Sequence, residues 1–158
     1  MKIKIISLGG TTEKGYETLC GEYYKRMGSG TVETRDLKPE ALSSDPSPAE
    51  IRNALEKEAD RILAEIPRQY YVIALCVEGK QTSSEELAAM LDNAALSGKS
   101  GAAFIIGSSY GLSERVKKAA DFRLSLSRLT LPHKLARLVL SEAVYRAFEI
   151  NKGSRYHK

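Results

Sequence analysis

The chain has 158 residues, of which 42% are hydrophobic and 28% are charged, and its formal net charge is +4. A chain of this length buries most of its surface in one layered core, so the composition indicates a single folded domain over residues 1–158 and argues against disorder. No apolar run approaches the roughly 20 residues that span a bilayer, and the first residues lack the features of a secretory signal. We therefore expect a cytoplasmic protein with no membrane partner. The positive charge permits a nucleic-acid partner without requiring one.

The residues that commonly bind metals are sparse. Cys20 and Cys76 lie far apart inside apolar segments, and neither has a histidine or cysteine at a metal-ligand spacing. We expect both cysteines to be buried as small hydrophobic residues and the chain to hold no metal.

The first quarter of the chain predicts a strand, a helix and a second strand. Residues 2–8 read as a half-buried strand that turns at a glycine pair. Apolar residues recur at helical spacing over residues 13–27, and Gly28 ends this helix. A short strand is expected at residues 31–37, followed by a loop over residues 38–47 that is rich in proline and serine.

Capping boxes predict the starts of two later helices. In a capping box, the side chains of a serine and of a glutamate three residues further on each accept a hydrogen bond from the other residue's backbone amide. Ser47 and Glu50 form the first box, with a proline at the next position, and its helix extends to Ile66. Ser83 and Glu86 form the second, for a helix through residue 96.

Nearly continuous apolar runs at residues 70–77 and 102–106 are typical of strands covered on both faces. These strands alternate with helices, which predicts an α/β fold with a mostly parallel sheet flanked by helices. A short helix at residues 113–120, a strand at 122–126 and a last helix at 133–150 complete the pattern. The last helix is apolar on more than one side, so we expect it also to bury surface against a partner.

Three segments that follow the last three predicted strands share an order and a spacing with a known family. They read VIALCVEGK at 72–80, FIIGSSYGL at 104–112 and LSLSRLTLPH at 124–133. Together with the ending RYHK, they resemble the ribosomal RNA large subunit methyltransferase H family, a minimal form of the SPOUT methyltransferases. The resemblance covers the whole chain and is most specific where LTLPH leads into RLVLSEAVYRAF.

This resemblance implies a fold, a reaction and partners. The family has an α/β domain with a C-terminal trefoil knot, works as a homodimer and binds S-adenosylmethionine in the knot. Its members methylate N3 of a pseudouridine in 23S ribosomal RNA, on the assembled ribosome. Ligands of parallel sheets bind at the carboxyl ends of the strands, where the three segments are expected to meet. Methyl transfer from a sulfonium requires alignment and exclusion of water, and needs neither a nucleophile triad nor a metal.

Carried over residue by residue, the resemblance implies a set of cofactor contacts. Apolar groups and backbone amides suit an adenine ring, and glycine permits close approach of the backbone. Each leucine read alone is an ordinary core residue, and each glycine an ordinary turn residue; their joint order favours the cofactor site. The implied contacts are Leu75, Gly107, Leu126, Ser127, Arg128, Leu129, Thr130 and Leu131.

The proton on N3 has to leave as the methyl group arrives, so a nearby base is useful. His133 is the first candidate, because it lies beside the implied cofactor segment at a helix start, where the helix dipole favours its neutral form. His157 near the chain end is the second. A structural histidine and a solvated tail are the respective alternatives.

Basic and aromatic residues near the end of the chain are the expected RNA contacts. We select Arg137, Arg155, Tyr156 and Lys158, because cations meet phosphates and a tyrosine ring stacks on an extruded base. Three further basic residues on the first helix extend this footprint or form a solvated face: Lys14, Lys25 and Arg26.

Two departures from the family leave alternatives open. Many members have a glycine where this chain has Ser108, and an acidic residue where it has Cys76. Both affect the implied cofactor site, so a non-enzymatic ribosome-binding protein of the same shape is the main alternative. A generic nucleotide-binding domain is a weaker one, because no phosphate-binding glycine fingerprint follows the first strand. Methylation of a different RNA is a third.

Overall fold

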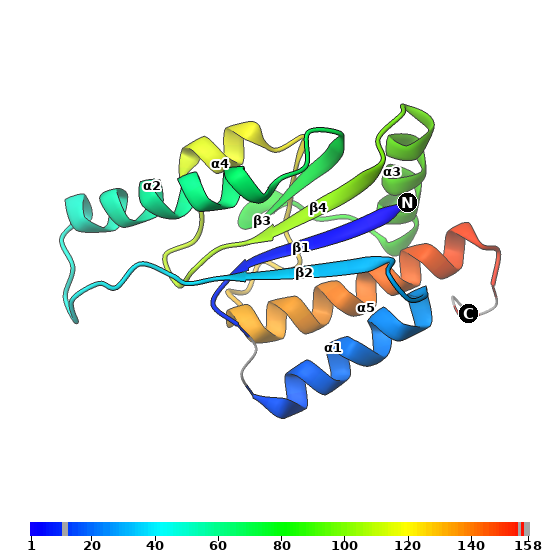
Figure 1. The fold of residues 1–158 in the computed structure, drawn as a ribbon, viewed down its shortest axis with the longest axis horizontal. Helices are drawn as coiled ribbons and strands as arrows, with labels where there is room; N and C mark the ends of the chain where they lie inside the picture. The colour runs from blue at the N-terminus through cyan, green and yellow to red at the C-terminus, as the bar shows by residue number, and fades with distance from the viewer. Residues whose placement is uncertain (11–12, 155, 157–158) are drawn as a thin grey trace.

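The computed structural model describes residues 1–10, 13–154 and 156. Five parallel strands form one sheet in the order β2-β1-β4-β3-β5, with helices on both faces (Figure 1). The elements are β1 (Lys2–Leu8), α1 (Lys14–Met27), β2 (Val32–Leu37), α2 (Pro48–Glu65), β3 (Tyr70–Lys80), α3 (Ser84–Leu96), β4 (Gly101–Ile106), α4 (Glu114–Ala119), β5 (Phe122–Leu124) and α5 (His133–Asn151). The predicted α/β class with a parallel sheet is confirmed, while the trefoil threading stays a prediction.

The core is divided by the sheet into two layers. On one face Ile3, Ile5 and Phe104 pack against α1, α3 and α5. On the other face Ile6 and Ile105 pack against α2 and α4. Figure 1 shows α1 and α5 together on one side of the sheet and α2 and α4 on the other. Both faces of the central strands are therefore covered, as their continuous apolar sequences require.

Both predicted capping boxes are present. The Ser47 hydroxyl accepts a hydrogen bond from the Glu50 amide at 3.2 Å, and the Glu50 carboxylate accepts one from the Ser47 amide at 2.7 Å. The matching distances between Ser83 and Glu86 are 3.1 and 2.8 Å. At the end of α1, Gly28 has a φ of 107°, a conformation that glycine adopts without strain.

The first strand is more deeply buried than its alternating charges predicted. Lys4 is only 8% exposed, although it carries a charge. Its ammonium lies 3.1 Å from a Glu33 carboxylate oxygen and 3.2 Å from one of Glu65. The expectation of a half-buried strand was wrong, because β1 is an interior strand and its lysine is satisfied by ion pairs instead of water.

The pairing between β3 and β5 also differs from the prediction. β3 continues to Lys80, beyond the predicted end at Val77, and β5 stops at Leu124. Both Leu75 and Lys80 pair with Leu124, so the residues between them bulge out of register. No local sequence pattern marks such a shift, because it depends on a strand that follows about forty residues later.

The last helix packs within this chain on two sides, against α1 and α3. Its Ser141 hydroxyl lies 2.9 Å from the Tyr24 hydroxyl of α1, and the Asn151 amide donates to the Ala88 carbonyl of α3 at 3.0 Å. These contacts account for its apolar residues on more than one side, so its composition alone does not require a partner. None of the helices within the described residues is long and apolar enough to cross a membrane.

Candidate functional site at the carboxyl edge of the sheet

The three segments that carried the family resemblance come together at one edge of the sheet. β4, β3 and β5 are neighbours and run parallel, so their carboxyl ends lie on the same edge. Ala74 pairs with Ile105, and Leu75 pairs with Leu124. The segment after each of these strands therefore starts beside the others, which is the arrangement expected of a ligand site in a parallel sheet.

The segment after β4 closes into a tight loop. A side chain on Gly107 would overlap the carbonyl oxygen of Gly111, so only glycine fits at this position. The Gly111 amide donates to the Ser108 carbonyl at 2.9 Å, and Gly111 itself has a φ of 82°. Gly107 is thus required for closing the loop whether or not a ligand is bound.

The end of β3 crosses close to β5. A Cβ on Gly79 would lie 2.7 Å from the Arg123 carbonyl oxygen, and the Ser125 amide donates to the Lys80 carbonyl at 3.0 Å. On α4, the Lys117 ammonium donates to Glu78 at 2.5 Å, and this bond lowers the pKa of the Glu78 carboxyl. Burial alone would lower the pKa of Lys117, but its bonds to Glu78 and Glu114 outweigh that effect and raise it. The β3 extension is therefore fixed by β5 on one side and by α4 on another.

The segment after β5 is held by short-range hydrogen bonds. The Ser125 hydroxyl donates to the Ser127 carbonyl at 2.9 Å, and the Ser127 hydroxyl accepts from the Leu129 amide at 3.0 Å. Leu126 packs on the core, whereas Leu129 is 73% exposed. The remaining predicted residues range from half-buried to exposed: Arg128, Thr130 and Leu131. The segment thus exposes the large apolar side chain of Leu129. Single exposed apolar residues are common in monomeric soluble proteins, but such a residue is also suited to contact a ligand or a partner protein.

The two cysteines differ in burial. Cys20 is buried as expected, whereas Cys76 is only partly buried, so the expectation for it was wrong. Cys76 lies in the part of β3 that bulges out of register with β5. Burial and the nearby Glu78 carboxylate raise the pKa of its thiol, which keeps it largely protonated at neutral pH.

His133 lies beside the first strand. It is the first residue of α5 and is half-buried. Its Nε2 atom lies 3.3 Å from the point where Gly9 would carry a Cβ, so the ring covers the glycine turn at the end of β1. His133 is therefore at the same edge of the sheet as the three segments. His157 lies outside the described residues.

Arg137 does not lie on the surface. It is 5% exposed, and its guanidinium donates to an Asp36 carboxylate oxygen at 2.6 Å. Burial alone would lower the pKa of Arg137, but its contacts with Tyr24 and Asp36 raise it. This placement does not support the predicted phosphate contact, because the guanidinium is already paired with a carboxylate and is hidden from solvent. Arg155 and Lys158 lie outside the described residues.

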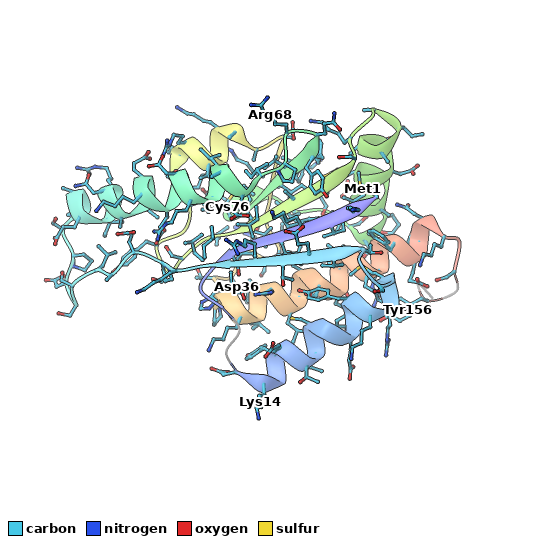
Figure 2. All side chains as sticks on the ribbon, in the orientation of Figure 1. Met1, Lys14, Asp36, Arg68, Cys76 and Tyr156 are labelled. Atoms are coloured by element: carbon cyan, nitrogen blue, oxygen red, sulfur yellow. The ribbon has the colours of Figure 1, made fainter. Side chains whose placement is uncertain are left out.

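Tyr156 lies beyond the other end of α5. Its ring packs against Tyr145 at 4.8 Å between centroids and lies 4.9 Å from the Arg146 guanidinium carbon. The basic residues of α1 that were expected to extend an RNA footprint, Lys14, Lys25 and Arg26, are exposed. Figure 2 shows Lys14 far from Tyr156, whereas Arg26 at the other end of α1 lies 5.9 Å from the Tyr145 ring on which Tyr156 packs. The predicted RNA residues are therefore divided between separate places in a single chain.

Two cavities open near the site. One of about 260 Å³ lies between α2, the loop after β2 and residues 108–110. Another of about 430 Å³ lies between α1, β2 and α5 and is lined by Tyr24, Asp36 and Arg137. Neither of these two cavities is lined by Leu75 or by residues 126–131.

The sequence analysis missed two polar partners. Glu58 of α2 is 3% exposed and accepts a hydrogen bond from the Ser108 hydroxyl at 3.0 Å. Asp36 pairs with Arg137 across 101 positions of the chain. For Glu58 a signal existed, because it interrupts the apolar stripe of its helix at helical spacing from Ile51 and Ile62. For Asp36 no local pattern was available.

Comparison with known proteins defines the class and then the family. The family model "Predicted SPOUT methyltransferase" matches residues 1–157. A probable methylase family protein from Haemophilus influenzae Rd KW20 superimposes with a TM-score of 0.53 over 99% of this chain and 70% of that one, at 15% identity. At this identity the likeness concerns the fold alone. The class is thus that of the SPOUT methyltransferases.

Closer relatives narrow the assignment. Proteins called ribosomal RNA large subunit methyltransferase H are 50% identical to this chain in Bacillus thuringiensis (strain Al Hakam), over 159 residues, and in Listeria monocytogenes serotype 4a (strain HCC23), over 163 residues. Both matches cover 100% of each chain. The chain belongs to the ribosomal RNA large subunit methyltransferase H family, as its motifs predicted. It is therefore a methyltransferase that uses S-adenosylmethionine, and the generic nucleotide-binding alternative is removed.

Proposed function

We propose that this protein transfers the methyl group of S-adenosylmethionine to N3 of a pseudouridine in 23S ribosomal RNA, on the assembled ribosome in the cytoplasm. The observation that supports this most is the meeting of the three motif segments at the carboxyl edge of β4, β3 and β5. The cofactor supplies an electrophilic methyl group, so the chain has to bind and orient both reactants and exclude water.

The cofactor lies against Leu75, Gly107 and residues 126–131 in this proposal. Leu75 packs at the boundary of the core, and Leu129 offers an exposed apolar surface to an adenine ring. The missing side chain at Gly107 lets the backbone of its loop approach the ligand. No charged cluster is needed, since the reaction proceeds by alignment of donor and acceptor.

His133 is our candidate to accept the N3 proton. It is the first residue of α5 and is half-buried, and an imidazole nitrogen is a common proton acceptor in catalysis. Its ring lies over the Gly9 turn at the same edge of the sheet as the cofactor segments. His157 remains the second candidate by its place in the RYHK ending.

The RNA surface is composite in our proposal, formed by two copies of the chain. Within one chain Arg26 and Tyr156 both lie beside Tyr145 in the second half of α5, whereas His133 and the motif edge lie at the start of that helix. A homodimer brings the chain end of one copy and the motif edge of the other within reach of a common site. Val139 of α5 exposes an apolar side chain that is available for such a contact. Equilibrium sedimentation tests this, and a monomer at micromolar concentration contradicts it.

The direct test of the function is transfer of labelled methyl from S-adenosylmethionine to purified ribosomes that lack this modification. We expect incorporation into ribosomes that contain the pseudouridine, and none when uridine replaces it or when free 23S RNA is supplied. Incorporation into uridine ribosomes contradicts the proposed target. No incorporation, despite binding of the cofactor, contradicts the proposed substrate.

The role of His133 is tested in the same assay with His133→Gln, which keeps a polar side chain of similar size. We expect the rate of methyl transfer to fall by about 100-fold or more, as for loss of a general base, with unchanged affinity for S-adenosylmethionine. An unchanged rate shows that His133 does not accept the N3 proton and makes His157 the remaining candidate for that role.

A further inference from the structure

A buried carboxylate lies next to the loop that is proposed to contact the cofactor. Glu58 projects from α2 and is 3% exposed. One of its carboxylate oxygens accepts a hydrogen bond from the Glu40 amide at 2.9 Å, and the other accepts one from the Ser108 hydroxyl at 3.0 Å. Each oxygen of the carboxylate is thus used by a different loop.

The position of Glu58 in its helix makes burial of its carboxylate unfavourable for the stability of the fold. It lies on the inward stripe of α2, with Ala54 and Ile62 one turn away on either side, and both of these are buried. Among the described residues, no lysine, arginine or histidine lies within ion-pair distance of it; the nearby Arg61 pairs with Glu40 at 2.7 Å. A charge in such surroundings is tolerated only because hydrogen bonds satisfy it. An apolar residue would suit the stripe better, so packing alone does not explain Glu58.

The hydrogen bond reaches the functional edge through one residue. Ser108 directly follows Gly107, and its carbonyl closes the loop by accepting from the Gly111 amide at 2.9 Å. The bond from Ser108 to Glu58 therefore connects this loop to α2, on the face of the sheet that α2 and α4 cover. The same carboxylate holds the loop after β2 through the Glu40 amide.

We propose that Glu58 is a positioning residue for cofactor binding: through the Ser108 hydroxyl it holds the Gly107 loop in the conformation that receives S-adenosylmethionine. A loop that adopts its binding conformation only part of the time binds its ligand more weakly by that fraction. A hydrogen bond to a charged group is strong enough to change such a population several-fold. The inference rests on the proposed contact between the cofactor and Gly107.

The test uses Ser108→Ala, which removes one hydroxyl from a half-buried position and leaves the backbone unchanged. We expect the Kd for S-adenosylmethionine, measured by calorimetry, to rise by about threefold to tenfold. The matched control is Ser109→Ala, because Ser109 is exposed on the same loop and its side chain makes no hydrogen bond with the described residues. The control is expected to keep the Kd of the unsubstituted protein within a factor of two.

A second variant distinguishes positioning from a general loss of stability. Glu58→Met removes both acceptor oxygens at similar side-chain volume, so neither the Ser108 hydroxyl nor the Glu40 amide keeps its partner. If the two residues act through one bond, the double variant raises the Kd no more than the larger single effect. Effects that multiply, or a Kd for Ser108→Ala equal to that of the control, overturn the inference.

Hydrogen exchange separates this result from the proposed cofactor placement. In the unsubstituted protein, peptides that cover residues 104–113 are expected to exchange more slowly when S-adenosylmethionine is bound. Absence of this protection, with binding demonstrated, contradicts the placement of the cofactor against Gly107. Protection in the unsubstituted protein together with unchanged affinity in Ser108→Ala contradicts the role of Glu58 alone.

Discussion

Substitution of Gly79 by alanine tests the close crossing of β3 and β5. The added Cβ would lie 2.7 Å from the Arg123 carbonyl oxygen and 2.8 Å from the carbonyl carbons of Arg123 and Leu124, and real Cβ contacts are essentially never below 3.0 Å. The atoms in the way belong to the backbone, so no side chain is able to rotate aside. Gly79 does not have a positive φ, so the effect is steric and not conformational. Overpacking of this kind costs about 1–3 kcal/mol of unfolding free energy.

This cost is measurable as a change in melting temperature. With an unfolding entropy of about 2.1 cal/mol/K per residue, a chain of 158 residues loses about 3 °C in Tm for each kcal/mol, so Gly79→Ala is expected to lower Tm by about 3–9 °C. Gly21→Ala is the control, because it lies inside α1 with nothing within 4 Å of the added carbon, and alanine there is expected to raise stability by about 0.5–1 kcal/mol. Thermal unfolding followed by circular dichroism compares the two. A Tm for Gly79→Ala equal to or above that of the unsubstituted protein refutes the steric reasoning.

Three further predictions concern charged and titratable groups. Arg137→Met is expected to lower the unfolding free energy by about 1–2 kcal/mol in urea titrations, because Asp36 loses its partner but still reaches water. The control is Arg68, which is exposed and projects from the surface in Figure 2. Arg68→Met is expected to change the unfolding free energy by less than about 0.5 kcal/mol. Hydrogen bonds from Lys4 and then Arg35 lower the pKa of Glu65 from 4.5, so the stability that its ionised carboxylate contributes is complete above about pH 4.5 and is lost as the pH falls through the lowered value. The difference in unfolding free energy between the unsubstituted protein and Glu65→Gln should therefore shrink below pH 4.5. A difference that grows as the pH falls contradicts this sign. Partial burial raises the pKa of Cys76 from its ordinary value of 9.0. In Cys20→Ser, where Cys76 is the remaining thiol, alkylation by iodoacetamide at pH 8.5 should therefore be slower in the folded chain than in urea. Equal rates contradict the raised pKa.

The order and type of the elements were predictable because their signals are local. Both capping boxes, the glycine after α1 and the continuous apolar runs of β3 and β4 each lie within a few residues of the structure that they specify. Errors arose where a distant part of the chain decides the outcome. Lys4 is buried because Glu65, which is 61 positions away, pairs with it. The extension of β3 to Lys80 depends on β5.

The meeting place of the motif segments was predictable from the sequence, whereas the contacts of individual side chains were not. The order of the three motif segments placed Leu75, Gly107 and residues 126–131 at one edge, because carboxyl ends of parallel strands share an edge. The partners of individual side chains were not accessible in the same way. Arg137 reads as a surface cation on a helix, and only the fold brings Asp36 of β2 to it. Ser108 reads as a weakened glycine motif, and only the fold supplies Glu58 as its partner.

The strand order has a consequence for the time course of synthesis. β1 is made first, yet one of its two neighbours is β4, which lies about one hundred residues later in the chain. At about 5–20 residues per second, β1 waits on the order of ten seconds before that neighbour is made. During this interval its backbone amides and carbonyls on that side have no strand to pair with, and its isoleucines lack the part of their cover that β4, α4 and α5 supply. The nascent chain is therefore most exposed to misassociation before Gly101–Ile106 has left the ribosome that makes it.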